Sequence, residues 1–171
     1  FVTTIGTGDY KPVTYEFEGR RCVETYVQAA LLQLLPEFLE PNAPDKILVL
    51  ETVGAEARHR AALSSRLSEL GILERVRFVR IPDGRSTDEL WALFGVIAES
   101  VAPRSTLVID VTHGYRSLPI AAVLGLTFLR EVAGVQVSRL VYGAMDAQSD
   151  GVAPVFDLKP MFDLTGRASA V

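Results

Sequence analysis

Apolar runs rich in β-branched residues alternate along this chain with segments in which apolar residues recur every three or four positions. The runs are typical of strands, and the longer spacing is typical of amphipathic helices. Strands are predicted at residues 2–5, 46–50, 76–81, 106–110 and 138–142, and helices at residues 23–38, 54–70, 86–101 and 118–132. This alternation predicts an α/β fold with a doubly wound, mainly parallel sheet and flanking helices.

Two smaller features extend the predicted sheet. A short β-hairpin is expected after the first strand, with residues 14–17 and 21–23 flanking a turn at 18–20, and residues 154–158 are expected to add a strand before Pro160. The run at 46–50 is almost wholly apolar, which predicts a central strand covered on both faces. Apolar and charged residues alternate at 76–81, so this strand is expected nearer an edge.

Local signals mark the ends of the helices. Pro41 and Pro44 are expected to end the first helix, and Gly71 to cap the second. Ser86 or Thr87, with Glu89 close by, is expected to begin the third.

The spacing also predicts which helix faces are buried. The second helix is expected to bury Leu63, Leu67 and Leu70 and to point Arg58, His59, Arg60 and Arg66 largely to solvent. The third is expected to bury Leu90, Phe94, Ile97 and Val101. The helix at 118–132 is apolar almost all round, so either the sheet and neighbouring helices or a second subunit is expected to cover it on several sides.

Composition narrows the class of protein. The chain has 171 residues, of which 49% are hydrophobic and 22% charged, which excludes disorder and predicts one globular domain over residues 1–171. The net charge of −4 argues against binding of long nucleic acid or acidic lipid by the whole surface, while a local basic pocket stays open.

The sequence offers few metal ligands and no membrane-spanning segment. One cysteine and two histidines leave no thiolate cage and few zinc ligands, so no metal is expected. No apolar run reaches the roughly 18 to 20 residues of a membrane span and no leader is recognisable, so a cytoplasmic location is expected. The chain opens on Phe1 rather than Met, and we expect its true N-terminus to be missing or processed.

Ligands of open parallel sheets bind beyond the carboxyl ends of the strands, and five expected loops lie there, at residues 6–10, 51–54, 82–84, 110–117 and 143–146. Two of these loops carry candidate chemistry. Gly6-Thr7-Gly8 follows the first strand and lets a phosphate approach backbone amides and the Thr7 hydroxyl. It lacks the third glycine of a dinucleotide fingerprint and the Lys-Ser/Thr of a P-loop. A plain glycine turn between two elements is the alternative explanation.

The second loop is Asp110-Val111-Thr112-His113-Gly114-Tyr115-Arg116-Ser117, which crowds an acid, hydroxyls, an imidazole and a guanidinium into one strand-to-helix turn. Arg116 and Ser117 fall where the helix dipole favours an anion, and arginine can fork two phosphate oxygens. Asp110 is expected to fix the loop by accepting hydrogen bonds from backbone or Thr112. His113 is open between ligand contact, packing and proton donation, with contact preferred. The alternative makes Ser117 a cap, Asp110 a turn former and Arg116 a solvated charge.

Other candidates are weaker. The Gly-x-Ser-x-Gly elbow of a Ser/His/Asp hydrolase is absent from the sequence. Cys22 is interpreted as a packing residue and His59 as a surface histidine.

Taken together, three segments resemble a known family. They are Thr4-Ile5-Gly6-Thr7-Gly8-Asp9-Tyr10-Lys11-Pro12 with the hairpin, Asp110-Val111-Thr112-His113-Gly114-Tyr115-Arg116-Ser117-Leu118-Pro119, and Tyr142-Gly143-Ala144. The chain resembles, over nearly its whole length, the CRISPR-associated Rossmann fold (CARF) sensor domain of ancillary proteins in type III CRISPR antiviral defence. The resemblance implies a Rossmann-like fold and a homodimer that binds one cyclic oligoadenylate ring across its two-fold axis, with cyclic tetra-adenylate favoured.

Carried over by position, the resemblance implies ligand-binding residues in both loops: Gly6, Thr7, Gly8, Asp9, Tyr10, Thr112, His113, Gly114, Arg116 and Ser117. It also implies a covalently linked effector domain, which this chain does not include. The helix after Ser117 becomes a candidate subunit contact.

Two alternatives stay open. In a free-standing ring nuclease, a ribose 2′-hydroxyl attacks its own phosphodiester without metal. Arg116 then faces the developing phosphorane, and Thr7 or His113 orients the hydroxyl or protonates the leaving oxygen. Relatives with this activity often have Lys where Arg116 stands, so sensing ranks before cleavage. The other alternative is an enzyme that binds one mononucleotide per subunit.

Overall fold

The computed structural model describes residues 1–40, 46–113 and 117–167. The strands are β1 (Val2–Ile5), β2 (Val13–Phe17), β3 (Arg20–Glu24), β4 (Ile47–Glu51), β5 (Val76–Arg80), β6 (Thr106–Asp110), β7 (Gln136–Gly143) and β8 (Val152–Asp157). The α-helices are α1 (Val27–Leu34), α2 (Val53–Glu69), α3 (Thr87–Ser100), α4 (Ser117–Ala133) and α5 (Lys159–Arg167). Short 3₁₀ turns lie at Pro36–Phe38, Leu73–Arg75 and Met145–Ala147.

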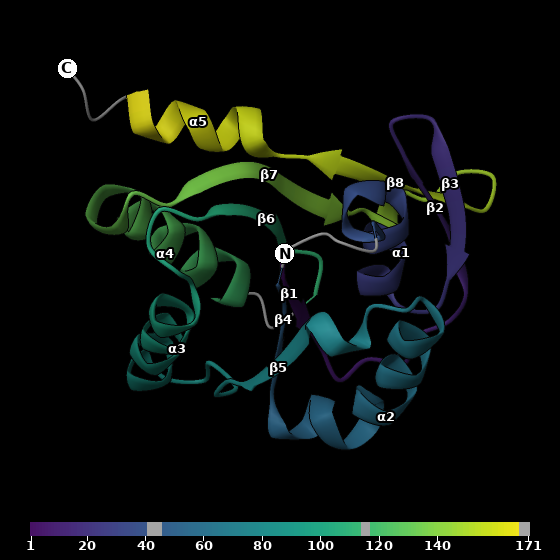
Figure 1. Cartoon of the computed structure of the whole chain (residues 1–171), viewed down its shortest axis with the longest axis horizontal. Coiled ribbons are helices and arrows are strands. Elements are labelled where there is room, and N and C mark those ends of the chain that lie inside the picture. The colour runs from purple at the N-terminus through teal and green to yellow at the C-terminus, as the bar shows by residue number, and fades with distance from the viewer. Residues whose placement is uncertain (41–45, 114–116, 168–171) are drawn as a thin grey trace.

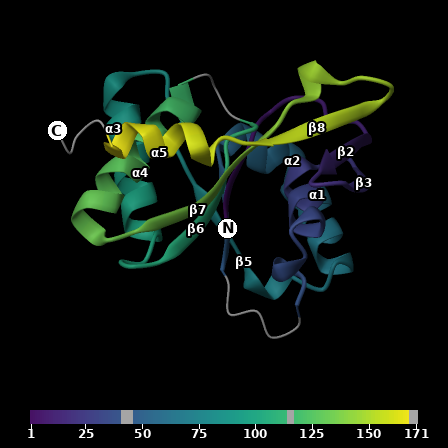
Figure 2. The same ribbon diagram turned by 90° about the horizontal axis from the view of Figure 1, so that it is seen from above.

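The strands form one sheet with helices on both faces, which confirms the expected Rossmann-like α/β fold. Helices α1 and α2 lie on one side of the sheet, and α3, α4 and α5 lie on the other (Figures 1 and 2). Strand β4 shows why both faces are covered, since Ile47 and Val49 join the core under α1 and α2 while Leu48 and Leu50 join the core under α3 and α4. Successive side chains of a strand point to opposite faces, so an unbroken apolar run serves both cores.

The strand order is β3-β2-β8-β7-β6-β1-β4-β5. Pairing is parallel throughout β7-β6-β1-β4-β5 and between β2 and β8, whereas β7 with β8 and β2 with β3 are antiparallel. Strand β5 lies at the edge, as its alternating sequence predicts. The chain leaves β1 toward β4 and β5 and later returns to its other side as β6 and β7, so a topological switch point lies between β1 and β6.

The predicted hairpin is present as β2 and β3. Glu18 and Gly19 connect the two strands with φ angles of 49° and 78°. Positive φ at both central residues is the geometry that matches the twist of paired strands. The hairpin joins the sheet beside β8 rather than beside β1, which the local pattern does not indicate.

The first helix is shorter than the sequence predicts. Val23 lies in β3 with 65% of its surface exposed, and α1 begins only at Val27. Pro36 opens a 3₁₀ turn directly after α1, so the regular helix ends at Leu34. The predicted stops at Pro41 and Pro44 lie outside the described residues.

Two expectations for the other helices need correction. Leu93, Ile97 and Val101 are the buried residues of the α3 segment, whereas Leu90 and Phe94 are only half-buried. The sequence does not predict helix α5, because Pro160 directly follows a predicted strand and is interpreted as its end. Proline is tolerated in the first turn of a helix, and Asp157 Oδ1 accepts a hydrogen bond from the Lys159 amide at 2.9 Å to support that turn.

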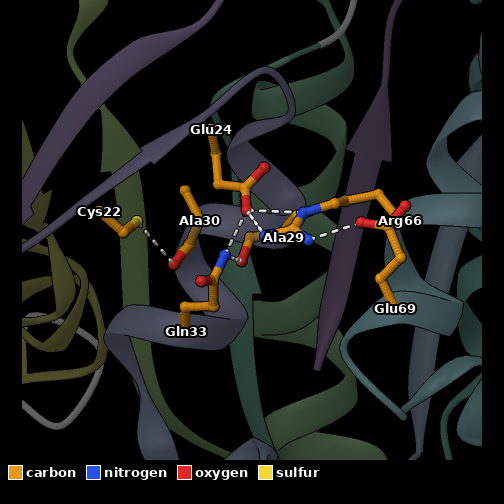
Figure 3. A network of polar contacts seen from close by, with 7 residues as sticks. All are labelled: Cys22, Glu24, Ala29, Ala30, Gln33, Arg66 and Glu69. Carbon is orange, nitrogen blue, oxygen red and sulfur yellow. Dashed lines mark hydrogen bonds and ion pairs between the residues drawn. The ribbon is translucent and has the colours of Figure 1, made fainter.

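Two arginines of α2 that were expected to face solvent instead pair with buried carboxylates. Arg66 binds Glu24, which is 5% exposed, with Nη2 at 2.5 Å and Nε at 2.8 Å from Oε1, and Gln33 of α1 donates to the same oxygen (Figure 3). Arg60 pairs with Glu51, which has no exposed surface. Both contacts tie α2 to the strand ends next to it.

Gly143 at the end of β7 has no room for a side chain. A Cβ atom there would lie 2.9 Å from Val27 Cγ2 and 3.3 Å from Thr112 Oγ1. We expect Gly143→Ala to lower the free energy of unfolding by about 1–3 kcal/mol, measured by urea denaturation, because the core must move to accept the methyl group. Gly95→Ala on α3 is the control, since no atom lies within 4 Å of its Cβ. Equal stability of the two variants would contradict the close packing of Gly143.

Candidate functional site

The two loops chosen from the sequence meet at the switch point between β1 and β6. A cavity of about 470 Å³ opens there, lined by the loop residues 6–11, by His113, and by Thr52, Met145 and the hairpin side. Its size lies within the usual range for small-molecule sites. Among the predicted ligand residues, Gly6, Thr7, Gly8, Asp9, Tyr10 and His113 line it.

Of the other four predicted residues, two are described by the structure. Thr112 is not among the lining residues, and its hydroxyl is engaged by the Asp110 carboxylate and the Gly143 amide. Ser117 is the first residue of α4. Gly114 and Arg116 lie outside the described residues.

Asp110 fixes the second loop, as expected from the sequence. Its Oδ1 accepts hydrogen bonds from the Thr112 amide at 2.8 Å and from the Thr112 hydroxyl, and its Oδ2 accepts from the Thr3 hydroxyl at 2.6 Å. Thr112 Oγ1 in turn accepts from the Gly143 amide at 2.8 Å. This network joins the carboxyl ends of β1, β6 and β7. Burial raises the pKa of Asp110, which these hydrogen bonds oppose.

A second set of contacts joins the loop to β1. The Thr4 hydroxyl donates to the carbonyl of His113, and the Gln28 amide of α1 donates to the Thr4 carbonyl at 2.6 Å. Gln28 is fully buried. The backbone at His113 is therefore held from two neighbouring strands and, through β1, from α1.

Tyr10 occupies the centre of the site. Its hydroxyl accepts a hydrogen bond from the Gly6 amide at 2.8 Å, so that amide is not available to a phosphate. Its ring centroid lies 4.8 Å from that of His113 in an edge arrangement and 5.4 Å from that of Tyr26 in a tilted one, and aromatic rings favour such geometries. Burial raises the pKa of Tyr10 to about 12, so the phenol stays neutral at pH 7.

His113 combines burial with an unmatched polar atom. Its Nε2 is buried without a hydrogen-bond partner. Burial, with a smaller contribution from the nearby His59, lowers the pKa of His113 to about 4. The imidazole is therefore neutral at pH 7. A buried polar atom without a partner is costly, and a ligand that reaches it recovers this cost.

Several residues of the site were missed by sequence reasoning. Thr25, Thr52 and Met145 line the cavity, and Arg58 and His59 of α2 contact the first loop from outside it. Thr52 follows β4 and Met145 follows β7, within two of the loops expected at the carboxyl edge, but no local pattern singles out these two residues.

Within the described part of the chain, no three His, Cys, Asp or Glu side chains gather so as to hold a metal ion. No helix in residues 1–40, 46–113 and 117–167 has the length and apolar character of a membrane span.

Comparison with known proteins gives two matches. Residues 1–146 match the family described as CRISPR system endoribonuclease Csx1, CARF domain. The chain is also similar to the CRISPR-associated protein MJ1674 of Methanocaldococcus jannaschii, with 33% identity over 86 residues, or 48% of this chain. The match covers 14% of that relative's length.

Proposed function

This chain belongs to the CARF domain family of the CRISPR system endoribonuclease Csx1, and we propose that it is a sensor domain of CRISPR defence that binds a cyclic oligoadenylate. The observation that carries the proposal is the cavity between the loops after β1 and β6. It lies at the switch point, where α/β folds bind nucleotides.

The chemistry of the cavity fits part of such a ligand. Tyr10 and Met145 offer apolar surface to a base, while Lys11 adds a positive charge at the lining for a phosphate. His113 also lines the cavity, and its buried Nε2 has no protein partner. We favour cyclic tetra-adenylate as the ring.

An exposed apolar face supports a homodimer. Ile120, Leu124, Phe128 and Val132 recur every four residues along α4, and all are between 47% and 64% exposed. Trp91 of α3 extends this face through Phe94, whose ring contacts both Trp91 and Phe128. The sheet and the neighbouring helices therefore cover only part of the surface of α4. Because the stripe starts close to the second loop, a partner across it brings two ligand sites together.

The dimer has a direct test. Leu124→Glu places a charge in the centre of the stripe, and we expect it to convert a dimer into a monomer in sedimentation velocity at micromolar concentration. Glu40→Lys, at an exposed position after α1 on the opposite side of the sheet, is the control for altered charge and is expected to remain dimeric. A monomeric wild-type protein would contradict the proposed assembly.

Arg116 is proposed to bind ring phosphate. We expect Arg116→Ala to weaken binding of cyclic tetra-adenylate by about 1.5–3 kcal/mol, roughly 10- to 150-fold in Kd, because a charged hydrogen-bonding site is lost. Isothermal titration measures the change. Arg77→Ala, an exposed position near the start of the edge strand β5, is the matched control. Equal affinity of both variants would mean that Arg116 does not contact the ring.

Cleavage of the ring remains the second candidate from the sequence, but no observation favours it. An imidazole with a pKa of about 4 is poorly matched to protonate a leaving oxygen at pH 7. We therefore expect the ring to elute unchanged from ion exchange after long incubation with the protein. An effector domain linked to this sensor in the full-length protein is part of the same proposal.

A further inference from the structure

Two consecutive residues of α2 hold two consecutive carbonyls of the first loop. Arg58 Nη1 donates to the carbonyl oxygen of Thr7 at 2.5 Å, and His59 Nε2 lies 2.9 Å from the carbonyl oxygen of Gly8. A carbonyl oxygen only accepts, so Nε2 of His59 carries the proton. Arg58 also lies 3.9 Å from the Asp9 carboxylate.

His59 also belongs to the aromatic cluster of the site. Its ring centroid lies 4.7 Å from that of Tyr10 and 5.9 Å from that of Tyr26. With Nε2 protonated, Nδ1 is the acceptor, and it lies 3.4 Å from the Tyr26 hydroxyl. Both ring nitrogens therefore have protein partners, which fixes the orientation of the imidazole. His59 and His113 contact Tyr10 in similar edge arrangements.

The two held carbonyls determine where the loop amides point. In a trans peptide the carbonyl and the following N–H point in opposite directions. The carbonyl oxygens of Thr7 and Gly8 both point toward α2. The N–H groups that follow them, those of Gly8 and Asp9, therefore point away from the helix. Successive amides that point the same way form an anion-binding arrangement.

We propose that Arg58 and His59 are positioning residues that hold the Gly8 and Asp9 amides in the orientation that receives a ligand phosphate. This inference rests on the proposed function. Arg58 and His59 contact the first loop from its outer face and order it before the ligand binds. A loop that is already ordered loses less conformational entropy on binding, so the ligand binds more tightly. Neither side chain is proposed to touch the ligand.

Variants at His59 separate positioning from packing. His59→Gln keeps an N–H donor that can reach the Gly8 carbonyl, His59→Phe keeps a ring against Tyr10 without a donor, and His59→Ala keeps neither. We expect Ala and Phe to weaken binding of cyclic tetra-adenylate about tenfold, and Gln to bind within about threefold of wild type. Arg58→Ala is expected to weaken binding by a similar factor, against Arg77→Ala as the control for lost charge.

A measurement without ligand keeps this inference separate from the proposed function. Backbone ¹⁵N relaxation of Gly8 and Asp9 is expected to show larger amplitudes in His59→Ala and His59→Phe than in wild type and His59→Gln. Unchanged relaxation, or equal affinity of all His59 variants, overturns the positioning role. If the wild-type protein binds no ring, the proposed function fails, and the relaxation data still decide whether α2 orders the loop.

Discussion

Replacing Arg60 by methionine is expected to lower the free energy of unfolding by about 3–5 kcal/mol, the range for breaking a buried ion pair by removing one partner. Glu51 ends β4 with no exposed surface and pairs with the Arg60 guanidinium. Without the Arg60 guanidinium, the Glu51 carboxylate keeps a buried charge that has no partner, or it takes up a proton. Methionine retains much of the aliphatic packing of Arg60 beside Phe78, over whose ring the guanidinium lies at 4.2 Å, so the loss reports mainly on the charge.

The double variant tests this explanation. Glu51→Gln with Arg60→Met removes both charges, and we expect it to recover most of the stability lost in Arg60→Met alone. Arg77→Met, at an exposed arginine of β5, is the control in urea denaturation. If Arg60→Met unfolds at the same urea concentration as this control, Glu51 does not depend on Arg60.

The second large effect is on the pH dependence of stability. Burial lowers the pKa of His113 from its ordinary 6.5 to about 4, so between these values the unfolded chain binds a proton that the folded chain does not. The free energy of unfolding therefore rises as the pH increases from 4 to 6.5 and decreases as the pH falls through the same interval. The full loss, reached below pH 4, is about 3 kcal/mol.

His113→Gln removes this titration and keeps a polar side chain of similar length. We expect the free energy of unfolding of wild type minus that of the variant, measured by urea denaturation from pH 4 to pH 8, to fall by about 3 kcal/mol between pH 7 and pH 4. Above pH 6.5 the difference is expected to be constant. Parallel curves over the whole range would contradict a buried, neutral His113.

The sheet and the position of the site could be predicted from the sequence because both depend on local patterns. The apolar run at Ile47–Leu50 needs cover on both faces, and the loops at Gly6 and Thr112 follow strands whose carboxyl ends share one edge. The role of Asp110 was predictable for the same reason, since an acid at a strand end has loop donors within two residues.

The start of α1 and the helix α5 were predicted wrongly, and both errors have local causes. Val23 continues the apolar spacing of α1 by coincidence, but its neighbours Cys22 and Glu24 follow the period of two that a strand requires. Pro160 was interpreted as a stop although a first helical turn accepts it. In both cases one residue was compatible with two structures, and pairing or capping by distant residues decided between them.

The support around the site depends on contacts between residues far apart in the chain. Arg58 and His59 have the spacing of exposed positions on α2, and their contacts with Thr7 and Gly8 span 51 residues. Nothing local marks such a contact. The same holds for Arg66, whose partner Glu24 comes 42 residues earlier.

We propose that the two loops of each chain form half of a site for one ring. Isothermal titration of the wild-type protein with cyclic tetra-adenylate tests it most directly, with adenosine monophosphate titrated in parallel. We expect one ring bound per two chains and much weaker binding of the mononucleotide. One ligand per chain, or binding of the mononucleotide without binding of the ring, would contradict it.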